Sequence, residues 1–222
     1  MLKWLATLFA SLVAIVAITA PANAFGIQES KQRHADQARL EAGLGDEAYG
    51  QKKWDEAIEH YTKAIDSNSC PGGCGKYLFR RGVAWQQKED CVHALADYKK
   101  AEETLTDNGE LFYNEFVCLS KANQNDEALA ALDKAIKVNP DSTNYHYGRC
   151  IILFNKHDFA GALPDCEQTL GPAPDDQVML VATATSAEQT GDKAKAAKYW
   201  KHLLELDKNN QQAKDGLART GG

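Results

Sequence analysis

Small and bulky apolar residues recur along this chain with a period of 34 residues. The most regular marker is an alanine, which stands at Ala57, Ala94, Ala128, Ala162 and Ala196. The first interval is 37 residues and the other three are 34, because three extra residues fall in the connection between Cys70 and Cys74. A fixed period of this length predicts an array of repeated units that pack on their neighbours and tolerate insertions between them.

Each marker alanine belongs to a pattern typical of paired amphipathic helices. Four residues after it stands a bulky or semi-bulky residue, at Tyr61, Tyr98, Leu132, Cys166 and Trp200. Twelve residues before it stands a mostly small residue, at Gly45, Gly82, Phe116, Cys150 and Ala184. Spacings of three and four keep residues on one helix face, and small residues let two antiparallel helices cross closely. Each repeat is therefore expected to be two helices joined by a short turn.

This pattern predicts an all-α fold with five helix pairs in tandem. The expected repeats span 38–71, 75–108, 109–142, 143–176 and 177–210. A helical extension is expected at 25–37, and a polar capping helix with a tail at 211–222, because the open end of an array needs a polar cover. Asp90, Asp158 and Asp192 fall at the expected turns, where an aspartate can cap the second helix of a pair.

Two runs, 54–65 and 126–140, carry the pattern most completely. On these residues the chain resembles the tetratricopeptide repeat, specifically an exported bacterial member, and the resemblance extends over about residues 38–210. It implies an α-solenoid. Phe116 stands where a small residue is usual, which predicts a wider third pair, and Cys150 and Cys166 replace usual markers in the fourth. The alternative is a generic helical bundle with accidental periodicity.

The first 24 residues have the features of a signal peptide. Lys3 supplies a positive start, an apolar stretch follows from Leu5 to Ala20, and residues 22–24 form a small-x-small cleavage site. Cleavage after Ala24 would leave Phe25 as the mature N-terminus. We expect a periplasmic or secreted protein without membrane contact once the signal is removed. An uncleaved membrane anchor is the alternative, because the apolar stretch is long for a signal peptide.

Charge and motifs narrow the possible functions. The formal net charge is −6 and no basic run occurs, which argues against nucleic acid as a partner. No nucleotide-binding loop, zinc-protease motif or nucleophile elbow is present, and the six histidines show no metal-ligand spacing. We therefore expect no catalysis, metal, other cofactor or small-molecule substrate.

All six cysteines follow the expected cleavage site, and an even number in an exported chain indicates disulfides. Helix adjacency favours the pairs Cys150–Cys166 and Cys91–Cys118, which leaves Cys70 to pair with Cys74 across the loop. Cys70 and Cys74 have a second interpretation as the reactive thiols of a thiol-disulfide or redox factor, or as metal ligands. Redox motifs usually place two residues between their cysteines at a helix start, whereas here the spacer has three and both residues are expected in a loop.

The resemblance to tetratricopeptide repeats implies that the first helix of each pair lines a concave groove. The fifth and ninth positions of these helices in repeats two to four are aromatic and β-branched, namely Phe79, Tyr113 and Tyr147, then Val83, Val117 and Ile151. Such a ladder suits peptide recognition, although packing between helices is the equal alternative. Lys76 and Arg80 add positive charge, but Asp46 disfavours a clamp for a peptide carboxylate.

These features predict a periplasmic interaction scaffold or adaptor that binds a protein or peptide in its groove. Two alternatives remain, a thiol-disulfide factor that uses Cys70 and Cys74, and a structural subunit of an envelope complex. The residue pattern does not identify the partner, since a fold does not determine a function.

Overall fold

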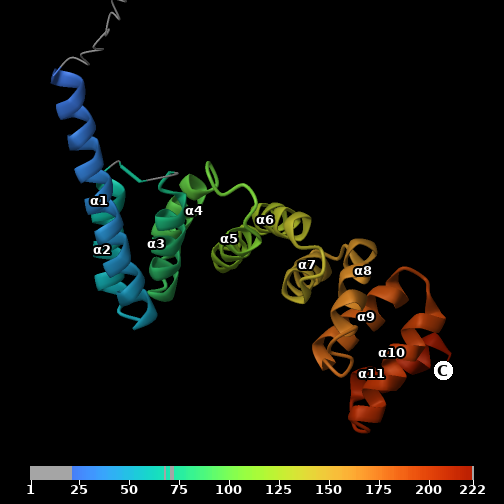
Figure 1. Ribbon diagram of the computed structural model, residues 1–222. Helices are drawn as coiled ribbons and strands as arrows, with labels where there is room; N and C mark the ends of the chain where they lie inside the picture. The colour runs from blue at the N-terminus through green and yellow to red at the C-terminus, as the bar shows by residue number, and fades with distance from the viewer. Residues whose placement is uncertain (1–21, 68, 71–72, 222) are drawn as a thin grey trace, which may run out of the picture.

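The computed structural model describes residues 22–67, 69–70 and 73–221, and this part of the chain is built from helices without a strand (Figure 1). The helices are α1 (Ala22–Gly50), α2 (Trp54–Asp66), α3 (Gly75–Gln87), α4 (Cys91–Ala101), α5 (Gly109–Lys121), α6 (Asn125–Val138), α7 (Thr143–Asn155), α8 (Phe159–Leu170), α9 (Gln177–Gln189), α10 (Lys193–Leu206) and α11 (Gln211–Thr220).

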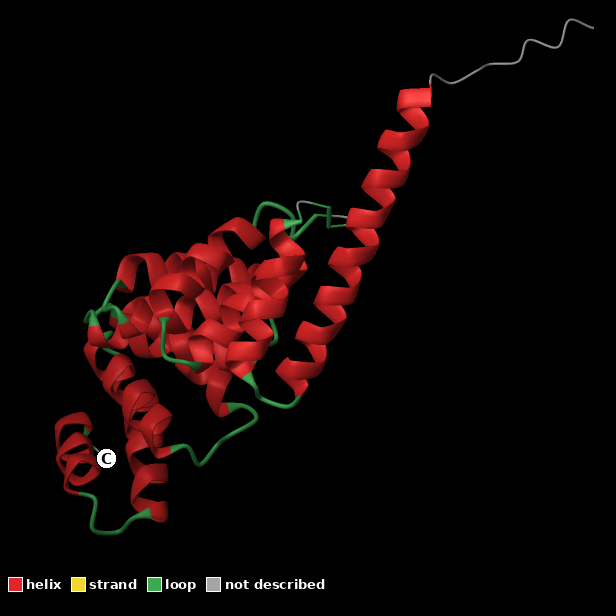
Figure 2. Ribbon diagram, turned by 90° about the vertical axis from the view of Figure 1, so that its left-hand side faces the viewer, coloured by secondary structure: helices red, strands yellow, loops and turns green. Residues whose placement is uncertain are grey.

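Consecutive helices pack as five pairs, from α1–α2 to α9–α10, and α11 packs against α10 at the C-terminal end. The expected all-α solenoid with five helix pairs and a closing helix is confirmed. Helices α3, α5, α7 and α9 begin at the first residues of the expected second to fifth repeats. The expected N-terminal extension is continuous with the first helix of the first repeat, so that α1 projects beyond the other helices (Figure 2).

A close contact between residues 16 positions apart joins the two helices of a pair. In the second repeat, a Cβ atom added at Gly82 would lie 2.5 Å from Cε1 of Tyr98, well inside van der Waals distance. In the first repeat, a Cβ atom added at Gly45 would lie 2.8 Å from the ring of Tyr61. Both tyrosines are fully buried. The small and bulky residues that mark the sequence period are therefore the two sides of one packing contact.

The third and fourth repeats replace this contact in different ways. In the third repeat the larger residue, Phe116, lies on the first helix and the smaller, Leu132, on the second. The ring of Phe116 lies so close to α7 that a Cβ atom added at Gly148 would meet it at 2.8 Å. The next repeat thus provides room for Phe116. In the fourth repeat, Cys150 and Cys166 occupy the two sides and lie at disulfide distance.

The turns within the helix pairs share one backbone conformation. One residue in each turn has a φ between 58° and 88°, and these residues keep the spacing of the repeats. They are Lys52, Glu89, Asn123, His157 and Gly191. The three expected aspartate caps are confirmed, because Asp90, Asp158 and Asp192 each accept a hydrogen bond from a backbone N–H of the following helix. A left-handed turn residue followed by a capping residue fixes the sharp reversal between paired helices.

The apolar core follows the interior of the array. Its C-terminal part is the most extensive, with Trp200, Leu203, Met179 and Leu180 fully buried. Gly216 of α11 lies against the ring of Trp200, where a Cβ atom would meet the indole at 2.4 Å. The closing helix therefore covers the last pair through the same small-to-large contact that joins the helices within a pair.

The expected signal peptide falls mostly outside the described residues, since the description begins at residue 22. None of the described helices is both long enough and apolar enough to span a lipid bilayer. Cleavage after Ala24 and export remain predictions.

Replacing Gly82 by alanine tests the packing contact. Because the new methyl group would overlap the buried ring of Tyr98, we expect Gly82→Ala to lower the free energy of unfolding by about 1–3 kcal/mol in urea titrations. Gly43→Ala is the control, since that glycine lies in α1 with no atom within 4 Å of the added Cβ position. The control should gain about 0.5–1 kcal/mol from helix propensity. Equal stability of both variants would contradict the contact.

Candidate functional site

The eight residues expected to line the groove all lie on first helices. Helix α3 carries Lys76, Phe79, Arg80 and Val83, α5 carries Tyr113 and Val117, and α7 carries Tyr147 and Ile151. The three aromatic and three β-branched residues among them are spaced by 34 residues, which places them at equivalent positions on successive first helices. The structure thus arranges them along a common series of helices.

The aromatic residues of this series are half-buried and take part in packing. The ring of Phe79 lies 6.1 Å from that of the buried Tyr98. The ring of Tyr113 lies 5.4 Å from Phe116 and 5.3 Å from Tyr145. Tyr147 packs against the C-terminal core cluster. These rings combine a packing role with a partly exposed surface.

The side chains of Val83 and Arg80 are less available to a bound peptide than the sequence suggests. Val83 retains only 8% of its exposure, because it belongs to the core around Tyr98, and its assignment to the groove is corrected on that ground. Arg80 forms an ion pair with Asp46, whose carboxylate also accepts a hydrogen bond of 2.7 Å from the hydroxyl of Tyr61. Burial, followed by this hydrogen bond, raises the pKa of Tyr61. Asp46 therefore already neutralises one of the two expected cations.

An apolar recess lies between α7 and α9, with a volume of about 390 Å³. Ile151 and Phe154 form one side, and Val178 and Val181 form the other. Val178 lines the recess and remains 55% exposed. Asn155, Gln177 and Asn210 contribute amide groups, and no charged residue lines the recess. Its chemistry suits an apolar side chain whose flanking backbone can hydrogen-bond to amides.

Sequence reasoning missed most of this recess. The fifth repeat lacks an aromatic residue at the position of the ladder, so only Ile151 was among the expected groove residues. The available signal was the pair Val178 and Val181, three residues apart on one face of α9, opposite Ile151 and Phe154 on α7.

The six cysteines lie in three pairs at disulfide distance, and these are the pairs expected from the sequence. The Cα–Cα distances are 5.1 Å, 5.2 Å and 5.2 Å for Cys70–Cys74, Cys91–Cys118 and Cys150–Cys166, within the range that a disulfide requires. The first lies between α2 and α3, the second links two repeats and the third lies within one repeat. Cys70 and Cys74 were both expected within a loop, away from a helix start. This expectation is corrected for Cys74, because it directly precedes α3 and so stands at a helix start.

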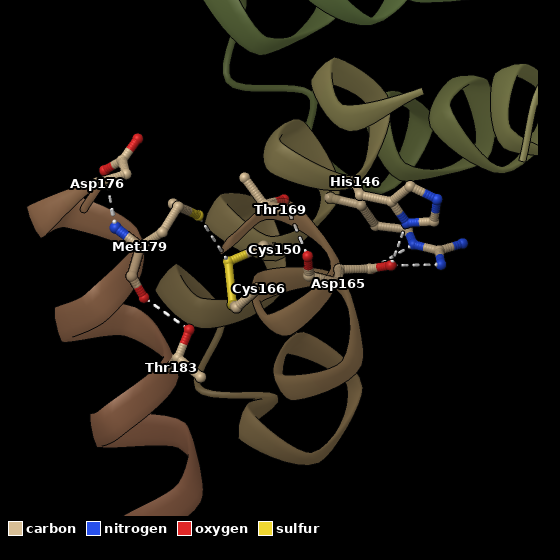
Figure 3. The surroundings of a disulfide bond; sticks show 9 residues. His146, Cys150, Asp165, Cys166, Thr169, Asp176, Met179 and Thr183 are labelled. Atoms are coloured by element: carbon tan, nitrogen blue, oxygen red, sulfur yellow. Dashed lines mark hydrogen bonds and ion pairs between the residues drawn. A yellow bond between two sulfur atoms is a disulfide. The ribbon is translucent and has the colours of Figure 1, made fainter. Parts of the chain in front are cut away.

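A buried polar network borders the Cys150–Cys166 pair (Figure 3). The imidazole of His146 lies with Nδ1 2.6 Å from Asp165 and Nε2 2.7 Å from the carbonyl oxygen of Pro140. Asp165 also accepts two hydrogen bonds from Arg149, at 2.6 Å and 2.8 Å. His146, unremarkable in the sequence, thus joins the end of the third repeat to both helices of the fourth. Within the described residues, no three metal-ligating side chains converge.

The family model for the tetratricopeptide repeat matches residues 43–108 and 119–177, which together make up more than half of the 222 residues. The chain belongs to the tetratricopeptide-repeat family. Proteins built from this repeat generally act as scaffolds that bind proteins or peptides and lack catalytic activity.

Other proteins share this repeat fold. A relative from Schizosaccharomyces pombe, named DnaJ homolog subfamily C member 7 homolog, is 27% identical over 203 residues, covering 84% of this chain and 42% of the relative. This tetratricopeptide chain therefore spans less than half of that protein.

Two solved structures show the same fold at low sequence identity. The tetratricopeptide protein YrrB, described as having an unusual peptide-binding site, superposes with a TM-score of 0.69 at 19% identity, over 89% of this chain and 98% of YrrB. The MamA protein superposes with a TM-score of 0.66 at 20% identity, over 83% of this chain and 95% of MamA.

Proposed function

We propose that this tetratricopeptide protein is an exported scaffold that binds a peptide or helix of a partner protein along its first helices. The recess between α7 and α9 carries the proposal, because it combines an exposed valine, an apolar lining and amide groups. We include Phe79, Tyr113 and Tyr147, which lie on the first helices α3, α5 and α7, in the proposed binding surface. The likeness to YrrB, a protein described as having a peptide-binding site, adds support for a peptide ligand.

The ligand should place an apolar side chain in the recess and its neighbouring backbone against Asn155, Gln177 and Asn210. An uncharged lining disfavours a charged anchor, because a charge moved from water into such a site loses hydration without gaining a partner. Half-buried rings elsewhere on the surface are pre-ordered by their packing, which limits the entropy that binding costs.

Replacing Val178 by aspartate tests the recess with peptides selected on the wild-type protein from a random display library. Because a carboxylate would stand beside the apolar anchor, we expect Val178→Asp to weaken these peptides tenfold or more, which corresponds to about 1.4 kcal/mol. The melting temperature should change little, since Val178 is 55% exposed.

Val92→Asp is the matched control for this experiment. Val92 is 79% exposed and lies on α4, a second helix, so its replacement should leave peptide affinity unchanged. Equal affinity of wild type and Val178→Asp for every selected peptide would reject the recess as the binding site.

Export is tested by the intact mass of the protein recovered from the periplasmic or secreted fraction. We expect residues 25–222 with six hydrogens fewer than the fully reduced chain, as three disulfides require. Reduction should restore these hydrogens. A cytoplasmic product that retains Met1, or one with six free thiols, would contradict export with disulfide formation.

A further inference from the structure

The second and fourth repeats contain an equivalent pair of a half-buried arginine and a buried aspartate. Arg81 on α3 donates two hydrogen bonds of 2.8 Å to the carboxylate of Asp97 on α4. Arg149 on α7 donates two hydrogen bonds, of 2.6 Å and 2.8 Å, to Asp165 on α8. In each pair the aspartate follows the arginine by 16 residues, and the two arginines are two repeats apart.

Each of these arginines also reaches the preceding repeat. The guanidinium of Arg81 donates a hydrogen bond of 2.9 Å to Thr62 on α2, and that of Arg149 donates one of 2.7 Å to Asp133 on α6. The guanidinium group therefore fills a space enclosed by two successive second helices and the first helix between them. This space is a built-in site for a planar cation.

The third repeat has the same space without the pair. The residue 34 positions after Arg81 is Glu115, and the residue 34 positions after Asp97 is Ala131. Both line a solvent-open cavity of about 570 Å³ between α4, α5 and α6. The cavity thus lies at the position where the second and fourth repeats hold a guanidinium group. In those repeats the second helix supplies the carboxylate, whereas here Glu115 on the first helix, α5, supplies it.

The charges around this cavity favour a cation. The cavity is lined by four glutamates and two lysines. Glu102 and Glu103 directly follow α4, Glu115 lies on α5 and Glu127 lies on α6, whereas the lysines are Lys99 and Lys134. Lys134 is already bonded to Glu102 at 2.6 Å. Among the described residues, Oε2 of Glu115 is shielded from solvent and has no hydrogen-bond partner. Glu115 therefore keeps one carboxylate oxygen that no described donor satisfies.

Burial, followed by the nearby carboxylate of Glu102, raises the pKa of Glu115 to about 7. Lys134 and Lys99 act in the opposite direction, without cancelling this effect. A cation placed beside Glu115 would favour the ionised form and expel the proton that Glu115 holds at lower pH.

We propose that this cavity binds the guanidinium group of an arginine side chain from a partner protein. The two fork-shaped contacts of Arg81 and Arg149 are the chemistry that the cavity can reproduce with Glu115 and Glu102 as acceptors. The site lies among the second helices α4 and α6, apart from the recess between α7 and α9. It therefore stands independently of the proposed peptide groove.

Nuclear magnetic resonance titration of the labelled protein with N-acetyl-arginine amide tests the cavity. We expect saturable shifts at amides of α4, α5 and α6 around Glu115 and Ala131, and none with the uncharged N-acetyl-citrulline amide. Affinity at pH 8 should exceed that at pH 5.5 by about tenfold or more, because the cation competes with the proton on Glu115. Equal responses to arginine and citrulline would overturn the proposal.

Variants separate this site from general effects on charge. Glu115→Gln keeps the size of the side chain and should weaken binding at least tenfold, whereas Glu110→Gln, on the exposed face of α5 outside the cavity, should leave it unchanged. The double variant Glu115→Arg with Ala131→Asp restores the pair of the neighbouring repeats and should fill the site from within. Undiminished binding by Glu115→Gln or by the double variant would refute the assignment.

Discussion

The array depends on the contact between a residue on each first helix and the residue 16 positions later on its second helix, which in the first two repeats joins a glycine to a tyrosine. Gly82 and Tyr98 show the contact at its tightest, since no side chain could be added at the glycine without displacing the ring. Dispersion and burial of the aromatic ring favour the contact, and the absence of a Cβ atom permits it. Because this contact sets how closely paired helices approach, it also sets where the first helices present their remaining faces.

A second set of interactions around this contact varies from repeat to repeat. The second and fourth repeats add a pair of a half-buried arginine and a buried aspartate, whose cost of desolvation is offset by two short hydrogen bonds and a third to the preceding repeat. The fourth repeat replaces the small-to-large contact itself with Cys150 and Cys166. The third repeat has neither an arginine–aspartate pair nor a cysteine pair at these positions, and its first helix carries Glu115 beside a cavity. Variation on a fixed repeat thus creates the individual sites.

The fold was predictable because its main contact recurs at a fixed spacing. The helix pairs could be predicted from the recurring positions of Gly45, Gly82 and Tyr98, and the helix caps from the aspartates at the turns. The recess between α7 and α9 was not predictable, since it depends on how far Val178 stays exposed once two repeats have packed. The cavity at Glu115 required the hydrogen bonds of Arg81 to be known first, because a glutamate on a helix is ordinarily a solvated surface residue. For the ladder, sequence position identified the helices but could not separate a buried Val83 from a partly exposed Ile151.

The central claim is that this tetratricopeptide protein receives its peptide ligand on the first helices, with the recess between α7 and α9 as the anchor. Hydrogen–deuterium exchange with and without a display-selected peptide measures this most directly, because it reports the backbone of every helix in one experiment. The account predicts slower exchange in α7 and α9 on binding, with α4 and α6 unchanged. Slower exchange confined to the second helices would contradict it.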